Sequence, residues 1–239
     1  MKIGKNLISG EWVNSKSNKT ISLINPSNGD TFSSIPSSEP LDIDLAAKSA
    51  RKAFEVHWEK TPAFERGKYL QKISEKINDS IEELALIESN DTGKPLKQSR
   101  IDAQVSARYF EYYAGAADKI HGEVIPSQSG INSFTKREPH GVTGHIIPWN
   151  YPMQIIGRTL GASLAMGNAC VLKPSEEACL TALAIGQLAN EAGFPEGSIN
   201  IITGLGEKAG SSLIKHPDIN HISFTGSVEI GKKVQTEAA

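Results

Sequence analysis

The sequence predicts an α/β protein in which helices pack around a parallel sheet. From Gly141 onward, short apolar, β-prone runs alternate with helical segments, and turns rich in glycine and proline follow the strands. Strands that alternate with crossover helices form a parallel sheet with helices on its faces. Before Gly141 the pattern is first hairpin-like and then helical. We therefore expect a layered α/β fold with an antiparallel addition near the N-terminus.

The segment from Ile8 to Phe32 favours short antiparallel strands. Its β-prone pieces, residues 11–13 and 20–24, are followed or separated by the turn signals Asn25-Pro26 and Asn28-Gly29. These features predict a small antiparallel flap.

Residues after Pro40 favour helices. Apolar residues recur at helical spacing in three segments, 43–53, 70–77 and 81–87, and a longer amphipathic run covers about Leu96 to Lys119. The second helix is expected to begin at Thr61-Pro62, with Thr61 as its N-cap residue and proline at the first helical position. Gly93-Lys94-Pro95 is expected to end the third helix.

Four strands and their crossover helices are predicted in the second half. The strands cover residues 142–147, 169–172, 199–203 and 221–224, and the helices cover 153–165, 176–192 and segments that start near Glu207 and Ser227. Ligands of such sheets bind outside the carboxyl ends of the strands. The segments that leave those ends are residues 148–150, 173–176, 204–206 and 225–227.

Composition excludes several kinds of partner. The chain has 239 residues and a formal net charge of -2, so it offers no basic field for nucleic acid or anionic lipid. The most apolar stretch, residues 153–165, is interrupted by Arg158 and falls short of the roughly 20 residues of a membrane span. Residues 1–6 do not resemble a signal peptide. We expect a small-molecule ligand, no membrane association and a cytoplasmic location.

The two cysteines exclude a disulfide framework and fit a reducing compartment. Cys170 lies in an apolar run predicted as a buried strand, and Cys179 lies in the helix predicted to follow it. Because apolar burial raises the pKa of a thiol, both are expected to be inert. No metal ligand set is expected.

The glycine-containing turns are weak signals when taken singly. Gly204-Leu205-Gly206 with Gly210 is a loose variant of the dinucleotide-binding turn, but it also fits an ordinary strand-to-helix turn. Phe224-Thr225-Gly226-Ser227 can form an anion site at a helix N-terminus, but it also fits an ordinary capped helix. Both interpretations of each turn remain open at this point.

Lys173 and Glu176 form a pair of opposite charges directly after a predicted buried strand, where an adenosine ribose lies in this class of fold. A carboxylate there can accept hydrogen bonds from ribose hydroxyls and repels a 2′-phosphate, which favours NAD over NADP without excluding NADP. The alternative is helix capping, with Ser175 as the N-cap residue and Glu176 in the first turn.

The combination of motifs is more specific than any one of them. Taken in order, they closely resemble the aldehyde dehydrogenase superfamily over essentially the whole chain, and the segments that carry the resemblance are residues 10–12, 25–29, 92–95, 141–152, 167–176, 191–195 and 224–227. The resemblance implies an aldehyde-dehydrogenase-like fold with a Rossmann-like cofactor sheet, and NAD(P)-dependent oxidation of an aldehyde to a carboxylic acid.

The resemblance also implies roles for individual residues. Asn150 corresponds to the asparagine whose amide stabilises the oxyanion formed when a cysteine thiolate attacks the aldehyde. Pro148 and Trp149 line the nicotinamide end of the cofactor. Lys173, Ser175 and Glu176 belong to the ribose site. Gly206 lies near the adenine, and the pyrophosphate lies on the turn formed by Phe224, Gly226 and Ser227.

In family members the nucleophilic cysteine and the glutamate that activates water follow this last turn, so both are expected beyond residue 239. We therefore expect a truncated enzyme that is inactive unless the rest of the polypeptide is supplied. Two alternatives are a stand-alone dinucleotide-binding module and an interaction surface for full-length homologues. Arg158-Thr159 stands where many members have Trp-Lys, so no proton-relay role is carried over to this position.

The resemblance divides the chain into three parts. Residues 1–118 form the N-terminal part of the cofactor-binding domain, residues 119–140 a small β arm of the oligomerisation region, and residues 141–239 an incomplete Rossmann-like NAD-binding core. A homo-oligomer is implied for the full-length enzyme.

Overall fold

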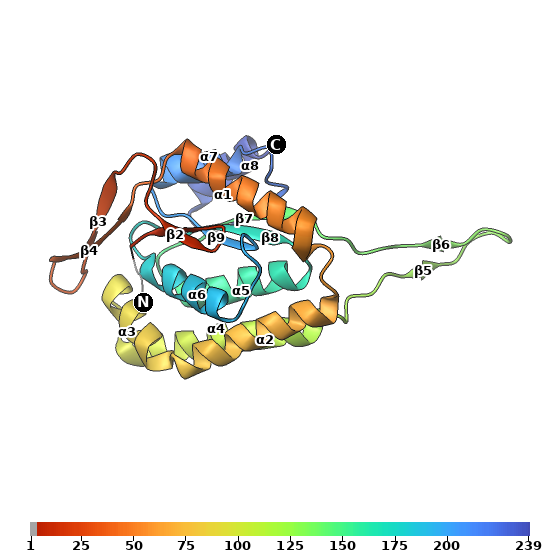
Figure 1. Ribbon diagram of the computed structural model, residues 1–239, viewed down its shortest axis with the longest axis horizontal. Helices are drawn as coiled ribbons and strands as arrows, with labels where there is room; N and C mark the ends of the chain where they lie inside the picture. The colour runs from red at the N-terminus through yellow and green to blue at the C-terminus, as the bar shows by residue number, and fades with distance from the viewer. Residues whose placement is uncertain (1–3) are drawn as a thin grey trace.

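A six-stranded sheet forms the centre of the computed structural model, which describes residues 4–239 (Figure 1). The strand order is β10-β7-β8-β9-β1-β2. The four parallel strands are β7 (Val142–Ile146), β8 (Ala169–Lys173), β9 (Ile199–Ile201) and β10 (His221–Phe224). The predicted parallel sheet is confirmed. Residues 1–3 of the predicted first domain lie outside the described residues.

Two antiparallel strands extend this sheet at one edge. They are β1 (Asn6–Ile8) and β2 (Glu11–Val13), and Leu7 of β1 pairs with Ile201 of β9. The antiparallel strand predicted at residues 11–13 is present, but it belongs to the main sheet and not to one flap with residues 20–24. The cause is the pairing of β1 with β9, a contact between distant parts of the chain that allows Leu7 to be completely buried in the core.

The flap itself consists of β3 (Thr20–Ile24) and β4 (Thr31–Pro36), which pair only with each other. Gly29 in the connecting turn has a positive φ of 79°, a conformation that glycine adopts without steric cost. Leu23 and Ile35 are buried and join the core that lies on the α5 and α6 side of the sheet. Figure 1 shows the hairpin at one end of the molecule.

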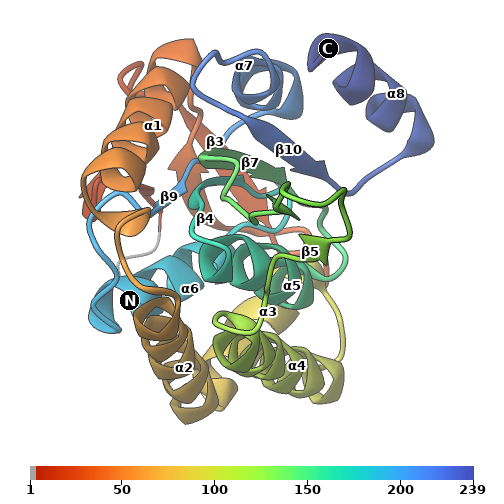
Figure 2. The ribbon, with the colours of Figure 1, turned by 90° about the vertical axis from the view of Figure 1, so that its right-hand side faces the viewer.

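Helices cover both faces of the sheet (Figure 2). One face packs against α5 (Pro152–Ala165) and α6 (Leu180–Glu191), and outside these lie α2 (Ala63–Asp79), α3 (Ile81–Thr92) and α4 (Leu96–Ala116). The other face packs against α1 (Pro40–Ala53), which continues into the π-helical turn η1 (Phe54–Trp58), and against η2 (Gly206–Gly210) and α7 (Ser211–Ile214). The last helix is α8 (Val228–Glu237). Two separate hydrophobic cores result, one on each face.

Two predicted helix starts are wrong. Thr61 is not the N-cap residue of α2: Pro62 occupies the cap and the helix begins at Ala63, while the Thr61 hydroxyl donates a hydrogen bond to the His57 carbonyl. The α6 helix begins at Leu180 and not at residue 176. The backbone N–H of Leu180 donates to Oδ2 of Asp91 at 2.8 Å, so a carboxylate from α3 satisfies an amide in the first turn of this helix.

Residues 119–140 form an arm that extends away from the rest of the molecule (Figure 1). Its two short strands are β5 (Val124–Ile125) and β6 (Ser133–Phe134), which pair with each other. Val124 and Phe134 are 87% and 72% exposed. Within the described part of the chain, no helix has the length and apolar character needed to cross a membrane.

Candidate functional site

The four parallel strands bring their carboxyl ends to one edge of the sheet. Residues 148–150 leave β7 there, residues 174–176 leave β8, residues 204–206 follow β9 and residues 225–227 follow β10. The segments that sequence analysis selected as candidate ligand sites therefore lie at the same edge. Hydrogen bonds join some of these segments directly, and two cavities border the others.

Lys173 and Glu176 form an ion pair at the end of β8. Their Nζ and Oε2 atoms are 2.8 Å apart, and Lys173 is almost completely buried. The backbone N–H of Gly206 donates to Oε1 of Glu176 at 3.5 Å, so this carboxylate joins two of the loops. Burial acts to raise the pKa of the Glu176 carboxyl, but the charge and hydrogen bond of Lys173 outweigh it, and the net shift is downward. Glu176 is thus held as a carboxylate.

The helix-capping interpretation of this segment is wrong. Because α6 begins at Leu180, Ser175 is not its N-cap residue and Glu176 is not in its first turn. The Ser175 hydroxyl instead accepts a hydrogen bond from the N–H of Glu177 at 3.4 Å. The lysine and glutamate therefore belong to an ordered loop that lies between a buried strand and the following helix.

A mainly apolar cavity of about 190 Å³ lies between η2, α7 and α8 and is bordered by Gly206, whose N–H donates to Glu176. Its lining includes Ile146, Gly206, Gly210, Ile214, Phe224 and Val234. Space around Gly206 is open, since a Cβ atom there would meet nothing within 4 Å. The cavity can take a flat apolar group that approaches past Gly206.

The turn after β10 depends on its glycine. A Cβ atom on Gly226 would lie 2.5 Å from Cζ of Phe224, so the Phe224 ring occupies the space that a larger residue would need. Ser227 is the N-cap residue of α8, and its Oγ accepts a hydrogen bond from the N–H of Ile230 at 3.3 Å. The other amides of this first turn are available to an anion.

Trp149 and Glu176 border a second cavity, of about 450 Å³. Other lining residues are Leu23, Ile24, Asp91, Thr92, Glu177 and Ala178. Trp149 is 55% exposed, and Asn150 next to it is also exposed. Within residues 4–239, the Asn150 amide has no hydrogen-bond partner. It remains able to donate to a ligand oxygen.

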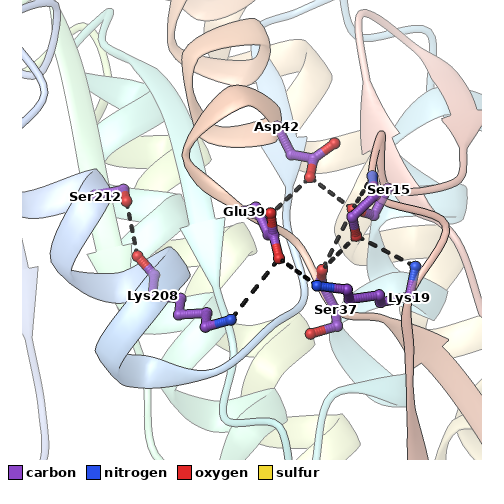
Figure 3. Close-up of polar contacts among 8 residues, drawn as sticks. Ser15, Lys19, Ser37, Glu39, Asp42, Lys208 and Ser212 are labelled. Carbon is purple, nitrogen blue, oxygen red and sulfur yellow. Dashed lines mark hydrogen bonds and ion pairs between the residues drawn. The ribbon is translucent and has the colours of Figure 1, made fainter.

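Polar contacts hold the start of α1 near η2 (Figure 3). Asp42 accepts hydrogen bonds from the N–H of Glu39 at 2.9 Å and from the hydroxyl of Ser15 at 2.7 Å. Oε1 of Glu39 lies 3.4 Å from Nζ of Lys19 and 3.8 Å from Nζ of Lys208 in η2. Sequence analysis gave these residues no role. They connect the N-terminal segments to the helix that borders the smaller cavity.

Neither cysteine has the properties of a nucleophile. Cys170 and Cys179 are completely buried. Burial raises the pKa of the Cys170 thiol to about 11, and burial together with the charge of Asp91 raises the pKa of Cys179. Arg158 and Thr159 border a separate cavity of about 680 Å³ that is also lined by Arg66, Arg137 and His140.

The sequence model of the aldehyde dehydrogenase family matches residues 12–239. The chain belongs to the aldehyde dehydrogenase family. It is 42% identical over 227 residues to hydroxyisobutyraldehyde dehydrogenase of Mycolicibacterium austroafricanum, a match that covers 95% of this chain and 45% of that aldehyde dehydrogenase. It is 42% identical over 232 residues to mitochondrial benzaldehyde dehydrogenase of Antirrhinum majus, covering 96% of this chain and 43% of the relative.

Solved aldehyde dehydrogenase structures have the same fold. A Burkholderia cenocepacia protein assigned to the aldehyde dehydrogenases is 55% identical with a TM-score of 0.97, over 98% of this chain and 50% of that one. Betaine aldehyde dehydrogenase of Staphylococcus aureus, in complex with NAD+, is 38% identical with a TM-score of 0.96, over 99% of this chain and 48% of that one. The chain spans about half the length of these relatives.

Proposed function

We propose that this chain provides the NAD site and the oxyanion donor of an enzyme that oxidises an aldehyde to a carboxylic acid. The observation that carries the proposal is the Glu176 carboxylate, held by Lys173 at the end of β8 and by the N–H of Gly206. Family membership and the NAD+ bound in the Staphylococcus aureus relative support the same cofactor. When bound, NAD supplies the acceptor for the hydride of the aldehyde carbon.

Residues at this edge of the sheet fit the parts of NAD. Glu176 accepts hydrogen bonds from the ribose hydroxyls, with Lys173 and Ser175 beside it, and the apolar cavity next to Gly206 takes the adenine. The turn of Phe224, Gly226 and Ser227 presents the N-terminus of α8 to the pyrophosphate. Pro148 and Trp149 lie toward the nicotinamide end, on the loop that follows β7.

The arrangement favours NAD over NADP. Glu176 carries a negative charge where a 2′-phosphate would add to the ribose, and the two charges would repel each other. The positive charge of Lys173 does not attract the 2′-phosphate strongly enough to cancel this repulsion, because Lys173 is already paired with Glu176 and is almost completely buried. NADP therefore binds more weakly than NAD.

Asn150 acts as the donor to the substrate oxygen. When a thiolate forms a bond to the aldehyde carbon, the carbonyl oxygen takes up the electron pair of the π bond and becomes negative. A neutral amide already aimed at that position stabilises the charge without reorganisation. Cys170 and Cys179 cannot supply the thiolate, since both are buried with raised pKa values, so the nucleophile and the base that activates water come from other residues.

The three proposed parts of the chain have different tasks. Residues 141–239 form the NAD-binding core, and residues 1–118 complete the domain around it, since β1, β2 and α1 to α4 cover this core. Residues 119–140 provide an arm for contacts between copies of the enzyme, which explains the exposure of Val124 and Phe134.

Calorimetric titration of the chain with NAD tests this proposal, after size-exclusion chromatography has shown that the sample is monodisperse. We expect saturable binding that is lost when Lys173 and Glu176 are replaced together by methionine and glutamine. The change Glu177→Gln, at the neighbouring exposed carboxylate, is the matched control and should leave binding intact. A monodisperse, folded chain that does not bind NAD would refute the proposed cofactor site.

A further inference from the structure

A buried polar network lies against the loop that carries Asn150. Nζ of Lys94 is 2.9 Å from Oε1 of Glu88 and 2.6 Å from Oδ2 of Asp102, and both carboxyl groups are completely buried. Lys94 belongs to the Thr92-Gly-Lys-Pro95 element that contributes to the family resemblance, and the proposed cofactor site gives this lysine no task. A lysine between two buried carboxylates joins α3 to α4.

The network reaches the Asn150 loop at two points. Nζ of Lys94 lies 4.5 Å from the centroid of the Tyr151 ring, and Tyr151 directly follows Asn150 in the chain. Nε2 of Gln154 donates to Oδ1 of Asp102 at 2.7 Å, and Gln154 lies in the first turn of α5. The loop is therefore fixed on its C-terminal side by a cation–π contact and by a hydrogen bond to a carboxylate.

Both carboxylate oxygens of Asp102 are used. Oδ2 faces Lys94, and Oδ1 accepts from Gln154 and also from Nε2 of Gln98 at 2.8 Å. Gln98 lies four residues before Asp102 on the same helix, so its bond stays within α4. Among the described residues, the hydrogen bond between Asp102 and α5 is the one with Gln154. Both glutamines thus donate to the same oxygen of Asp102, but the bond from Gln154 joins two helices and the bond from Gln98 stays within one.

Asn150 depends on this support because its own amide has no hydrogen-bond partner within residues 4–239. Its position follows from the residues on either side of it. On the N-terminal side, Ile147 donates its N–H to the Lys173 carbonyl at 3.2 Å. On the C-terminal side, the contacts are those of Tyr151 and Gln154 with the network.

We infer that Lys94 and Gln154, which meet on Asp102, are positioning residues that set the place of the Asn150 amide. The inference rests on the proposed function of Asn150 as oxyanion donor. Displacement of the donor amide lowers the rate strongly, since a shift of about 1 Å in the position of a catalytic group can cost about 10²-fold in rate. The network acts on the substrate oxygen only through Asn150.

The changes Gln154→Met and Gln98→Met test this inference as a matched pair. Each removes one amide donor to the same oxygen of Asp102, and both glutamines are partly buried. In ¹H–¹⁵N spectra of the 239-residue chain, the side-chain amide signals of Asn150 are assigned by their loss in Asn150→Ala. Gln154→Met should shift, split or broaden these signals and the neighbouring Trp149 indole signal. Gln98→Met should leave both unchanged.

Lys94 needs two variants, because Lys94→Met leaves two buried carboxylates without their cation and can prevent folding. Lys94→Arg keeps the charge and the contact with the Tyr151 ring, and it should restore the Asn150 signals relative to Lys94→Met. Asn150 and Trp149 signals that stay unchanged in Gln154→Met, or that move equally in Gln98→Met, would overturn the inference.

Activity provides a second readout in a chimera that joins this chain to the second half of the Burkholderia cenocepacia relative. Gln154→Met should lower kcat by up to about 10²-fold while the KM for NAD stays the same, and Gln98→Met should change neither. If the unmodified chimera folds and does not oxidise aldehydes, the proposed function fails. The spectra of the chain alone still decide whether the network positions Asn150.

Discussion

The ammonium group of Lys173 lies 2.8 Å from Oε2 of Glu176, and Lys173 is the last residue of the buried parallel strand β8, where it pairs with Ile146. The other oxygen of the same carboxylate accepts the N–H of Gly206. One glutamate therefore connects the loops that follow β8 and β9, and its charge is fixed by a lysine that is itself almost completely buried. In the proposed function, the position and charge of this carboxylate set the preference for NAD over NADP.

Replacement of Glu176 by alanine should weaken NAD more than NADP. The change removes a charged acceptor of ribose hydrogen bonds, worth about 1.5–3 kcal/mol, which corresponds to roughly 10- to 100-fold in Kd. It also removes the repulsion of a 2′-phosphate, so the loss for NADP should be smaller. Calorimetric Kd values for both dinucleotides, measured on the chain, give the ratio.

Glu177→Ala provides the control for this experiment, because Glu177 is the adjacent carboxylate but is exposed and makes no ion pair within the described residues. It should leave the ratio of the two Kd values unchanged. An unchanged ratio in Glu176→Ala would show that this carboxylate only holds the loops together.

Local sequence patterns predicted most of this edge of the sheet. The apolar runs of β7 to β10 set the strands, and a parallel arrangement then brings their carboxyl ends together without further information. Gly226 was also recognisable, although its physical reason, the Phe224 ring that occupies the space of a Cβ atom, is visible only in the structure.

The errors arose where residues far apart in sequence meet. Leu7 pairs with Ile201, so the first strand joins the main sheet although its own sequence indicates only a short hairpin. The segment 176–179 has helical propensity, but Lys173 holds Glu176 and Asp91 binds the N–H of Leu180, which moves the helix start to Leu180. Propensity and periodicity contain no information on such partners.

Asn150→Ala should reduce turnover far more than it reduces NAD affinity. Loss of one oxyanion donor typically costs about 10²–10³ in kcat. Within residues 4–239, the Asn150 side chain makes no hydrogen bond to the Glu176 loop and does not line the apolar cavity next to Gly206. The chimera with the Burkholderia cenocepacia relative allows kcat to be measured, and calorimetry on the chain gives the NAD affinity. Unchanged turnover would refute the role of Asn150 as oxyanion donor.

Neither thiol of the native chain should react with a disulfide reagent such as Ellman's reagent at pH 8. Cys170 and Cys179 are completely buried, and burial raises the pKa of the Cys170 thiol to about 11. Both thiols should react after unfolding in guanidinium chloride, and this control gives the total number of thiols that the reagent can detect. Rapid labelling of one thiol in the native chain would contradict the assignment of both cysteines to the core.

Asp91 should make the stability of the chain fall as the pH rises from about 4 to about 7. Burial, which outweighs the hydrogen bond from the N–H of Leu180, raises the pKa of this carboxyl from 3.8 to about 7, and the charge of Glu88 acts in the same direction. Between these two values the folded chain keeps the proton while the unfolded chain loses it. Folding then binds a proton, so the free energy of unfolding decreases by at most about 1.4 kcal/mol per pH unit.

The change Asp91→Asn isolates this contribution because asparagine does not titrate and can still accept the N–H of Leu180. Relative to the unmodified chain, the variant should become progressively more stable between pH 4 and pH 7 and should gain nothing further above that range. Urea denaturation at several pH values measures the difference, and Asp79→Asn, at an exposed aspartate at the end of α2, is the control. A constant difference across the range would mean that Asp91 is already ionised in the folded chain and that its charge is stabilised by a partner outside the described residues 4–239.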